Sequence, residues 1–196
     1  MIDAEMYGMM PNAKIEKNIA WSGSCVSSVD GPSKPGYTER FETSGLGAPD
    51  IVLIHGGTND FNHNFGGTGK EIPNTDGYYY EDEVPASVMQ KLFDTPIDQL
   101  NTMNFLDAYV KLIKLIHEAH PSARIVIVIG DRPPEAMEHG MQQIADHYDF
   151  VKAVDFRAAG YNNLPKFEGS HPTKEGHWTM ATKIYNELGS WLMGGA

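Results

Sequence analysis

Residues 50–60 have the sequence DIVLIHGGTND, a continuous apolar run that ends in two glycines and then three polar residues. Such a run is typical of a buried strand in a parallel sheet, because helices cover both faces of that sheet. Residues 124–130 (RIVIVIG) repeat the pattern more strongly, and residues 13–21 and 150–155 repeat it more weakly. The sequence therefore predicts four strands.

Helical periodicity lies between and after these strands. In residues 102–119 apolar side chains recur every three or four positions, and Pro121 then ends the pattern. Two further helices are expected over residues 134–148 and from about residue 172 to 192. Because strands alternate with helices, we expect a single α/β domain over residues 1–196, with a parallel sheet between helical layers.

The stretch 61–98 departs from this alternation. It mixes glycine, asparagine and acidic residues with the run Tyr78-Tyr79-Tyr80. It is too long for an ordinary connection, and it leaves from the carboxyl end of the 50–55 strand, where open α/β sheets bind ligands. We expect a long loop insertion that either contacts substrate or is a solvated surface excursion.

Composition excludes several classes of partner. The formal net charge of −11 opposes binding to phosphate backbones, so no nucleic acid is expected. No apolar run approaches the roughly 20 residues of a membrane helix, so no membrane partner is expected.

The start MIDAEMYGMM lacks the features of a signal peptide. The sequence as given predicts a soluble, cytoplasmic protein, or a secreted one if its natural start lies upstream. The single cysteine, Cys25, excludes an internal disulfide.

Three short segments carry residues that suit acyl transfer, which needs a nucleophile, an oriented base and donors for the developing oxyanion. Gly23, in the sequence WSGS, can present a bare backbone N–H at close range. Asn59 offers a side-chain N–H from the end of a strand. His171, just before the last helix, can act as a general base near neutral pH. Glu168, three residues earlier, can accept a hydrogen bond from its Nδ1–H.

These segments resemble three of the four sequence blocks of the SGNH (GDSL-type) hydrolases. The blocks are WSGS, the Gly-x-Asn-Asp of residues 57–60, and the acid-x-x-His-Pro of residues 168–172. The sequences NIAWSGSCVSS and PDIVLIHGGTND resemble in particular a group common in gut bacteria. The resemblance covers nearly the whole chain and implies a flavodoxin-like three-layer α/β/α fold. It also implies that Gly23 and Asn59 are oxyanion donors and that His171 is the base.

The sequence departs from the family pattern at the nucleophile. The family opens with a strand that ends in Gly-Asp-Ser, whose serine attacks the ester, and this sequence contains no such tripeptide. In the family that strand lies inside the sheet, so its loss would leave strand edges unpaired. Three explanations stay open. Met1 is not the natural start, a homo-oligomer fills the gap, or the protein is a relative that no longer catalyses.

A second departure concerns the acid that orients the base. Glu168 stands where the family usually has Asp, and Asp155, at the end of its own strand, is the alternative. For the nucleophile, Ser24 is the candidate because it follows the oxyanion glycine. We favour the interpretation in which Ser24 and its neighbouring serines cap a helix or bond to the backbone. Cys25 is a weaker candidate.

Two other classes of function remain as alternatives. His55, Asp60 and His63, with His171 and His177, could suit zinc, but they lack a fixed ligand spacing, and His55 in an apolar strand is more often a buried structural residue. We therefore expect no metal or other cofactor. The missing serine and the tyrosine run fit a non-catalytic carbohydrate-binding relative. The preferred function is a carboxylic ester hydrolase that acts on a small acyl ester, such as an acetylated sugar.

Overall fold

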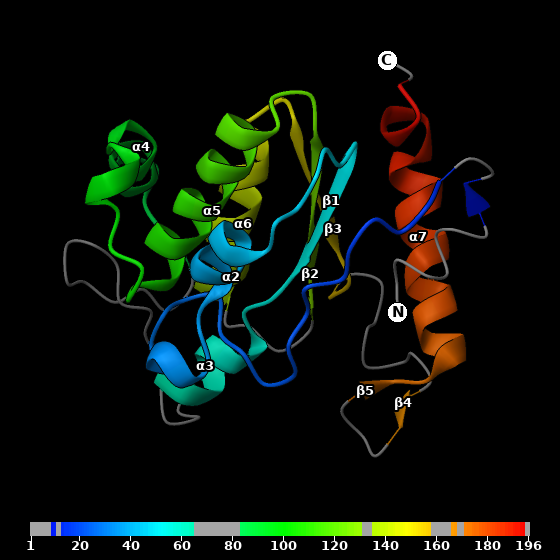
Figure 1. The fold of residues 1–196 in the computed structure, drawn as a ribbon, viewed down its shortest axis with the longest axis horizontal. Helices are drawn as coiled ribbons and strands as arrows, with labels where there is room; N and C mark the ends of the chain where they lie inside the picture. Colours follow the sequence, from blue (N-terminus) through cyan, green and yellow to red (C-terminus); the bar gives the residue numbers. More distant parts are fainter. Residues whose placement is uncertain are drawn as a thin grey trace.

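The structure is a computed structural model that describes residues 9–10, 13–64, 83–130, 135–157, 166–167 and 171–194. Its centre is a parallel sheet with the strand order β1-β2-β3 (Figure 1). These strands are β1 (Ile51–His55), β2 (Arg124–Ile129) and β3 (Val151–Asp155). Ile51 pairs with Arg124, and Ile125 pairs with Val151. Three of the predicted strands are therefore confirmed. A short antiparallel pair, β4 (Lys166–Phe167) and β5 (His171–Pro172), lies outside this sheet.

Helices occupy both faces of the sheet. In chain order they are η1 (Gly31–Ser33), α2 (Tyr37–Thr43), α3 (Thr58–Asn64), α4 (Ala86–Asp94), η2 (Ile97–Gln99), α5 (Phe105–Ala119), α6 (Glu135–His147) and α7 (Lys174–Leu192). The predicted helices over 102–119, 134–148 and 172–192 are confirmed as α5, α6 and α7. Helix α7 begins at Lys174 because the Thr173 side chain caps it, accepting a hydrogen bond from the Gly176 N–H.

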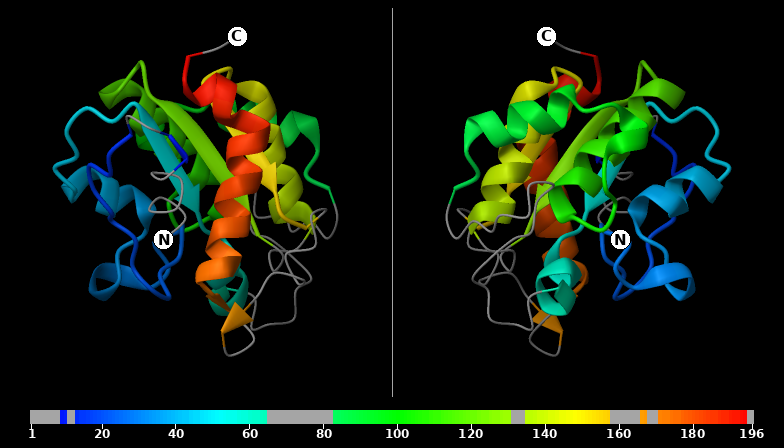
Figure 2. Two further views of the ribbon diagram at one scale, coloured as in Figure 1. Left: turned by 90° about the vertical axis from the view of Figure 1, so that its right-hand side faces the viewer. Right: turned by 90° about the vertical axis from the view of Figure 1, so that its left-hand side faces the viewer.

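The side chains of β2 alternate between two hydrophobic cores. Ile125, Ile127 and Ile129 pack with α4, α5 and α6, whereas Val126 and Val128 pack with α7. All five are fully buried. The two cores make the molecule a three-layer α/β/α structure, with α7 over one face of the strands and α5 and α6 over the other (Figures 1 and 2). The predicted fold class is confirmed.

Residues 13–21 form no strand, so that prediction is wrong. A strand needs a hydrogen-bonded neighbour, and within the described residues β1 pairs only with β2. The segment is largely exposed, and side chains hold it instead. Arg40 Nη1 donates to the Ile19 carbonyl at 2.7 Å, and Lys17 donates to the Ser44 carbonyl. Since β2 lies between β1 and β3, its residues 125–129 are all buried, whereas β1 is only partly buried.

The described parts of the stretch 61–98 are mainly helical, so the long loop expected there is wrong in those parts. Helix α3 extends to Asn64, and α4 packs Met89 and Leu92 into the core because these side chains lie on one helical face. Residues 65–82, which include Tyr78-Tyr79-Tyr80, lie outside the described part of the chain.

Candidate active site

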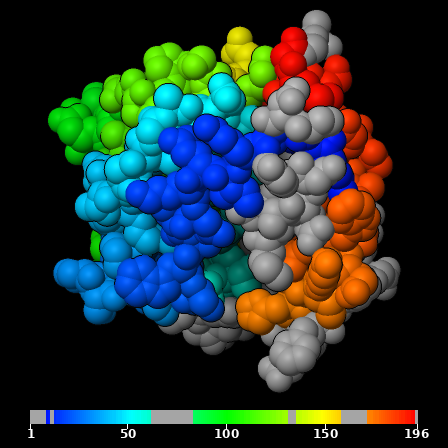
Figure 3. Space-filling model, turned by 45° about the vertical axis from the view of Figure 1, so that its right-hand side comes forward, coloured from blue at the N-terminus to red at the C-terminus, as the bar shows by residue number. Residues whose placement is uncertain are grey.

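The described parts of the three predicted segments lie at the carboxyl ends of the strands (Figure 1). Helix α3 follows β1 directly, and β5 leads into α7 at the same end of the sheet (Figure 1). In the space-filling view the blue N-terminal segment, the teal surface of α3 and the orange start of α7 meet on one face (Figure 3). Open α/β sheets bind ligands at this end.

Gly23 lies in a tight turn formed by Trp21–Ser24. The Ser24 N–H donates to the Trp21 carbonyl at 3.2 Å, and Gly23 has a φ of 74° at the third position of the turn. This is the left-handed region that a type II turn requires there and that glycine adopts without strain. Lys34 Nζ donates to the Gly23 carbonyl at 3.1 Å. The direction of the Gly23 backbone is therefore held from both sides.

Asn59 lies in the first turn of α3 and contacts the same loop. Its Nδ2 donates to the Ser24 carbonyl at 3.2 Å. A side-chain amide carries two N–H groups, so this bond orients the amide and leaves the second N–H for a ligand. The structure thus links the two predicted oxyanion donors, Gly23 and Asn59, through one residue.

Ser24, the candidate nucleophile, is turned into the protein. Its side chain belongs to a residue only 3% exposed, and its Oγ donates to the Trp21 carbonyl at 2.7 Å. This arrangement favours the interpretation in which the hydroxyl bonds to the backbone. Cys25 is fully buried, and burial raises the pKa of its thiol far above the ordinary value. Such a thiol is a poor nucleophile because little thiolate forms.

Asp60 binds the loop that follows Gly23, a contact that the sequence did not predict. Its fully buried carboxylate accepts hydrogen bonds from the Val26 N–H (2.8 Å), the Ser27 N–H (2.9 Å) and the Ser27 hydroxyl (2.6 Å). Burial raises its pKa, and the bonds from Ser27 and Val26 oppose that rise. The sequence considered Asp60 as a metal ligand, yet both its oxygens bind the loop. No group of three metal-ligating side chains occurs among the described residues.

The end of β1 packs tightly against the loop and α2. Tyr37 Oη donates to the His55 carbonyl at 2.8 Å. A Cβ at Gly56 would lie 2.6 Å from Val26 Cγ2 and 2.8 Å from the Tyr37 ring, so only glycine fits. His55 itself is exposed, because it is the last residue of β1, so its expected burial is wrong.

We expect Gly56→Ala to lower the free energy of unfolding by about 1 to 3 kcal/mol, because the added methyl overpacks a closed contact. Urea unfolding monitored by circular dichroism measures the change. The control is Ala119→Gly at the exposed end of α5, which shows how much stability an ordinary change at a helix end costs. Gly31→Ala is not used, because Gly31 has a positive φ that alanine would strain. An unfolding midpoint unchanged in Gly56→Ala would contradict the packing described.

His171 lies exposed on β5, opposite Phe167 in the β4–β5 pair. Glu168, its predicted orienting acid, lies outside the described residues and stays a prediction. In Asp155, the alternative acid, Oδ1 accepts a hydrogen bond from the Arg157 N–H at 2.7 Å. Burial raises the pKa of Glu138, and the nearby Asp155 raises it further, while Arg157 lowers it. Within the described residues no hydrogen bond joins Asp155 to His171.

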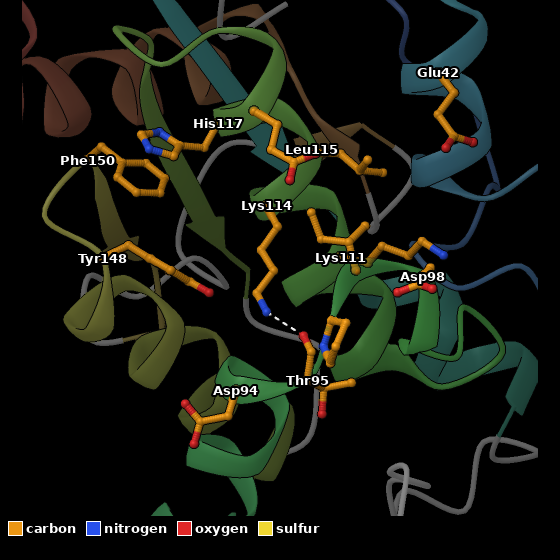
Figure 4. A pocket seen from close by; sticks show the side chains of 13 residues that line it. Glu42, Asp94, Thr95, Asp98, Lys111, Lys114, Leu115, His117, Tyr148 and Phe150 are labelled. Atoms are coloured by element: carbon orange, nitrogen blue, oxygen red, sulfur yellow. Dashed lines mark hydrogen bonds between the residues drawn. The ribbon is translucent and has the colours of Figure 1, made fainter.

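A cavity of about 950 Å³ lies at the opposite end of the sheet. Its lining includes the end of α5 and Phe150, which directly precedes β3. Lys114 points into it, but its Nζ donates to the Phe93 and Thr95 carbonyls at 2.7 Å each, so this cation holds the end of α4 (Figure 4). None of the predicted site residues lines this cavity.

No helix in the described part of the chain is both long and apolar enough to cross a membrane.

The family profile of GDSL-like lipase/acylhydrolase proteins matches residues 9–188. No curated protein matches the chain. Among solved structures, a candidate GDSL-like lipase from Bacteroides uniformis is 21% identical, with a TM-score of 0.61, and covers 94% of this chain and 75% of that chain. Another from Bacteroides ovatus is 18% identical, with a TM-score of 0.65, and covers 97% and 78% respectively.

Proposed function

Because the chain belongs to the GDSL-like lipase/acylhydrolase family, we propose that it hydrolyses carboxylic esters of small acyl groups at the face where the Gly23 turn, α3 and β5 meet. The observation that carries this proposal is the hydrogen bond from Asn59 to the Ser24 carbonyl, 3.2 Å long. It ties the side-chain donor to the turn that presents the Gly23 N–H. Two rigid donors beside one another suit the oxyanion of a tetrahedral intermediate.

The reaction needs a group that attacks the ester carbonyl. In this chain we assign that role to a water molecule, with His171 as the general base that takes its proton. The carbonyl oxygen becomes an oxyanion bound by the Gly23 N–H and the Asn59 amide. The intermediate then collapses, the alcohol oxygen leaves with the proton from His171, and the carboxylic acid is released. An oxyanion hole without a serine nucleophile still supports rates on the order of 10³ above the uncatalysed reaction.

Ser24 provides the test that separates water from a serine nucleophile. We expect Ser24→Ala to keep kcat for p-nitrophenyl acetate within about threefold of the parent protein, and to lose about 1 kcal/mol of stability, since it removes one hydrogen bond to the Trp21 carbonyl. Ser22→Ala, which changes an exposed neighbour in the same turn, is the matched control. A loss of 10⁴-fold confined to Ser24→Ala would instead identify Ser24 as the nucleophile.

An acylated carbohydrate is the substrate class that we propose. Trp21 is the first residue of the Gly23 turn and is 51% exposed, so an aromatic face is open to solvent beside the proposed oxyanion donors. Aromatic faces pack well against the apolar faces of sugar rings. Acetylated xylose should therefore have a lower KM than ethyl acetate, and Trp21→Ala should remove that preference. Equal KM values for both esters in the parent protein would count against a sugar substrate.

The exposed Trp21 also favours a second candidate, a non-catalytic carbohydrate-binding relative. The two functions differ in turnover. Sugar binding detected by calorimetry, without release of acetate from acetylated xylose over the buffer rate, would select the binding protein over the hydrolase.

A further inference from the structure

We propose that Asp60 is a positioning residue that holds the Gly23 turn in the shape needed for an oxyanion hole. The inference rests on the proposed function, because it assigns Asp60 a role in that same site. Asp60 does not face the substrate. It acts through the loop of residues 24–27, which follows the turn and which its carboxylate binds.

The geometry of the carboxylate carries this proposal. One oxygen accepts from the Val26 N–H at 2.8 Å, and the other accepts from the Ser27 N–H at 2.9 Å and the Ser27 hydroxyl at 2.6 Å. Two successive backbone N–H groups that converge on one carboxylate fix the direction of the chain on both sides of a peptide bond. Asp60 and Val26 are both fully buried, so water cannot replace these bonds without opening the packing.

The position of Asp60 next to Asn59 explains how its bonds to Val26 and Ser27 affect the Gly23 turn. Asn59 holds the Ser24 carbonyl, and Asp60 holds the next two amide groups that follow Cys25. Two neighbouring residues of α3 therefore bind one continuous stretch of the loop. Because α3 follows β1 directly, the loop is fastened to the sheet itself. The Trp21–Ser24 turn thus has one end anchored to the helix that follows β1.

Asparagine at position 60 is the sharpest test of the role. It keeps the size of the side chain, but it replaces one acceptor oxygen with an NH₂ group that would face a backbone N–H. The loop then loses at least one bond and gains a repulsive contact. Ser27→Ala is a milder second variant, which removes the 2.6 Å hydroxyl bond to Asp60 but keeps the Ser27 N–H, and it remains informative if Asp60→Asn does not fold.

Asp107→Asn is the matched control. Asp107 is also fully buried and also occupies the third position of its helix, α5, where it accepts a hydrogen bond from the Asn101 N–H at 3.3 Å. Its 3.3 Å bond goes to Asn101, whereas Asp60 binds Val26 and Ser27. A comparison of the two variants therefore separates a general loss of stability from a change at the oxyanion turn.

The experiment combines ester kinetics with amide hydrogen exchange on the full chain. We expect Asp60→Asn to lower kcat for p-nitrophenyl acetate at least tenfold while KM changes less than threefold, and Ser27→Ala to lower kcat about threefold. The amides of Val26 and Ser27 should exchange at least tenfold faster in Asp60→Asn. Asp107→Asn should keep kcat and the exchange of these two amides near the parent values.

Two results would overturn the role of Asp60. One is unchanged exchange at Val26 and Ser27 in both loop variants, and the other is an equal loss of kcat in Asp60→Asn and Asp107→Asn. If the parent protein shows no ester turnover, the proposed function fails, and exchange alone decides whether Asp60 holds the loop. Faster exchange in Asp60→Asn would then support the structural role without the catalytic one.

Discussion

Replacing His171 with glutamine is expected to lower kcat for a short acyl ester by on the order of 10², because no other group at the site is assigned to take the proton from the attacking water. Glutamine keeps a polar side chain of similar reach but cannot accept and return a proton near neutral pH. The initial rate of p-nitrophenol release, measured at several substrate concentrations, separates the effect on kcat from that on KM.

His147→Gln is the control for this substitution. His147 is an exposed histidine at the end of α6, at the other end of the sheet, where its ring stacks on Phe93. We expect its variant to keep the parental kcat. Equal activity of His171→Gln and the parent protein would remove His171 from the proposed mechanism, whatever the effect on KM.

Replacing Asn59 with alanine is expected to lower kcat by on the order of 10²–10³, the usual consequence of removing one oxyanion donor. The effect should fall on kcat more than on KM, since the donor is needed most when negative charge develops on the carbonyl oxygen. The substitution also removes the bond to the Ser24 carbonyl, so some loss of order in the turn is expected.

Asn59→Asp removes both N–H groups of the amide and adds a negative charge at the same place. The carboxylate has the same shape, but it has no N–H to donate and would repel an oxyanion. We therefore expect Asn59→Asp to be at least as impaired as Asn59→Ala. Asn186→Ala, on the exposed side of α7, should have the parental kcat. An Asn59→Asp variant with full activity would exclude the amide as an oxyanion donor.

Much of the fold was predictable because its signals are local. The apolar run of β2 and the helical stripe of α5 each follow from side chains within a few positions of one another. Residues 13–21 carry a similar but weaker pattern and form no strand. A strand exists only through pairing with another segment, and no property of those nine residues reveals whether a neighbour is present.

In the candidate site, too, the local features were predictable and the long-range contacts were not. Gly23 and Asn59 were recognisable from short motifs, and the structure joins them through the Ser24 carbonyl. The hydrogen bonds of Asp60 were not predictable, because its partners Val26 and Ser27 are 34 and 33 residues away in the sequence. Asp60 is a buried acid beside Asn59 in the first turn of α3. A carboxylate buried there needs hydrogen-bond donors to offset the cost of its burial.

The most direct measurement is the rate of p-nitrophenyl acetate hydrolysis by the parent protein and by the double variant Asn59→Ala/His171→Gln at equal concentration. We expect the parent to exceed the buffer rate by on the order of 10³ and the double variant to fall to within about tenfold of buffer. Equal rates for the two proteins would contradict an ester-hydrolysing site at Gly23, Asn59 and His171.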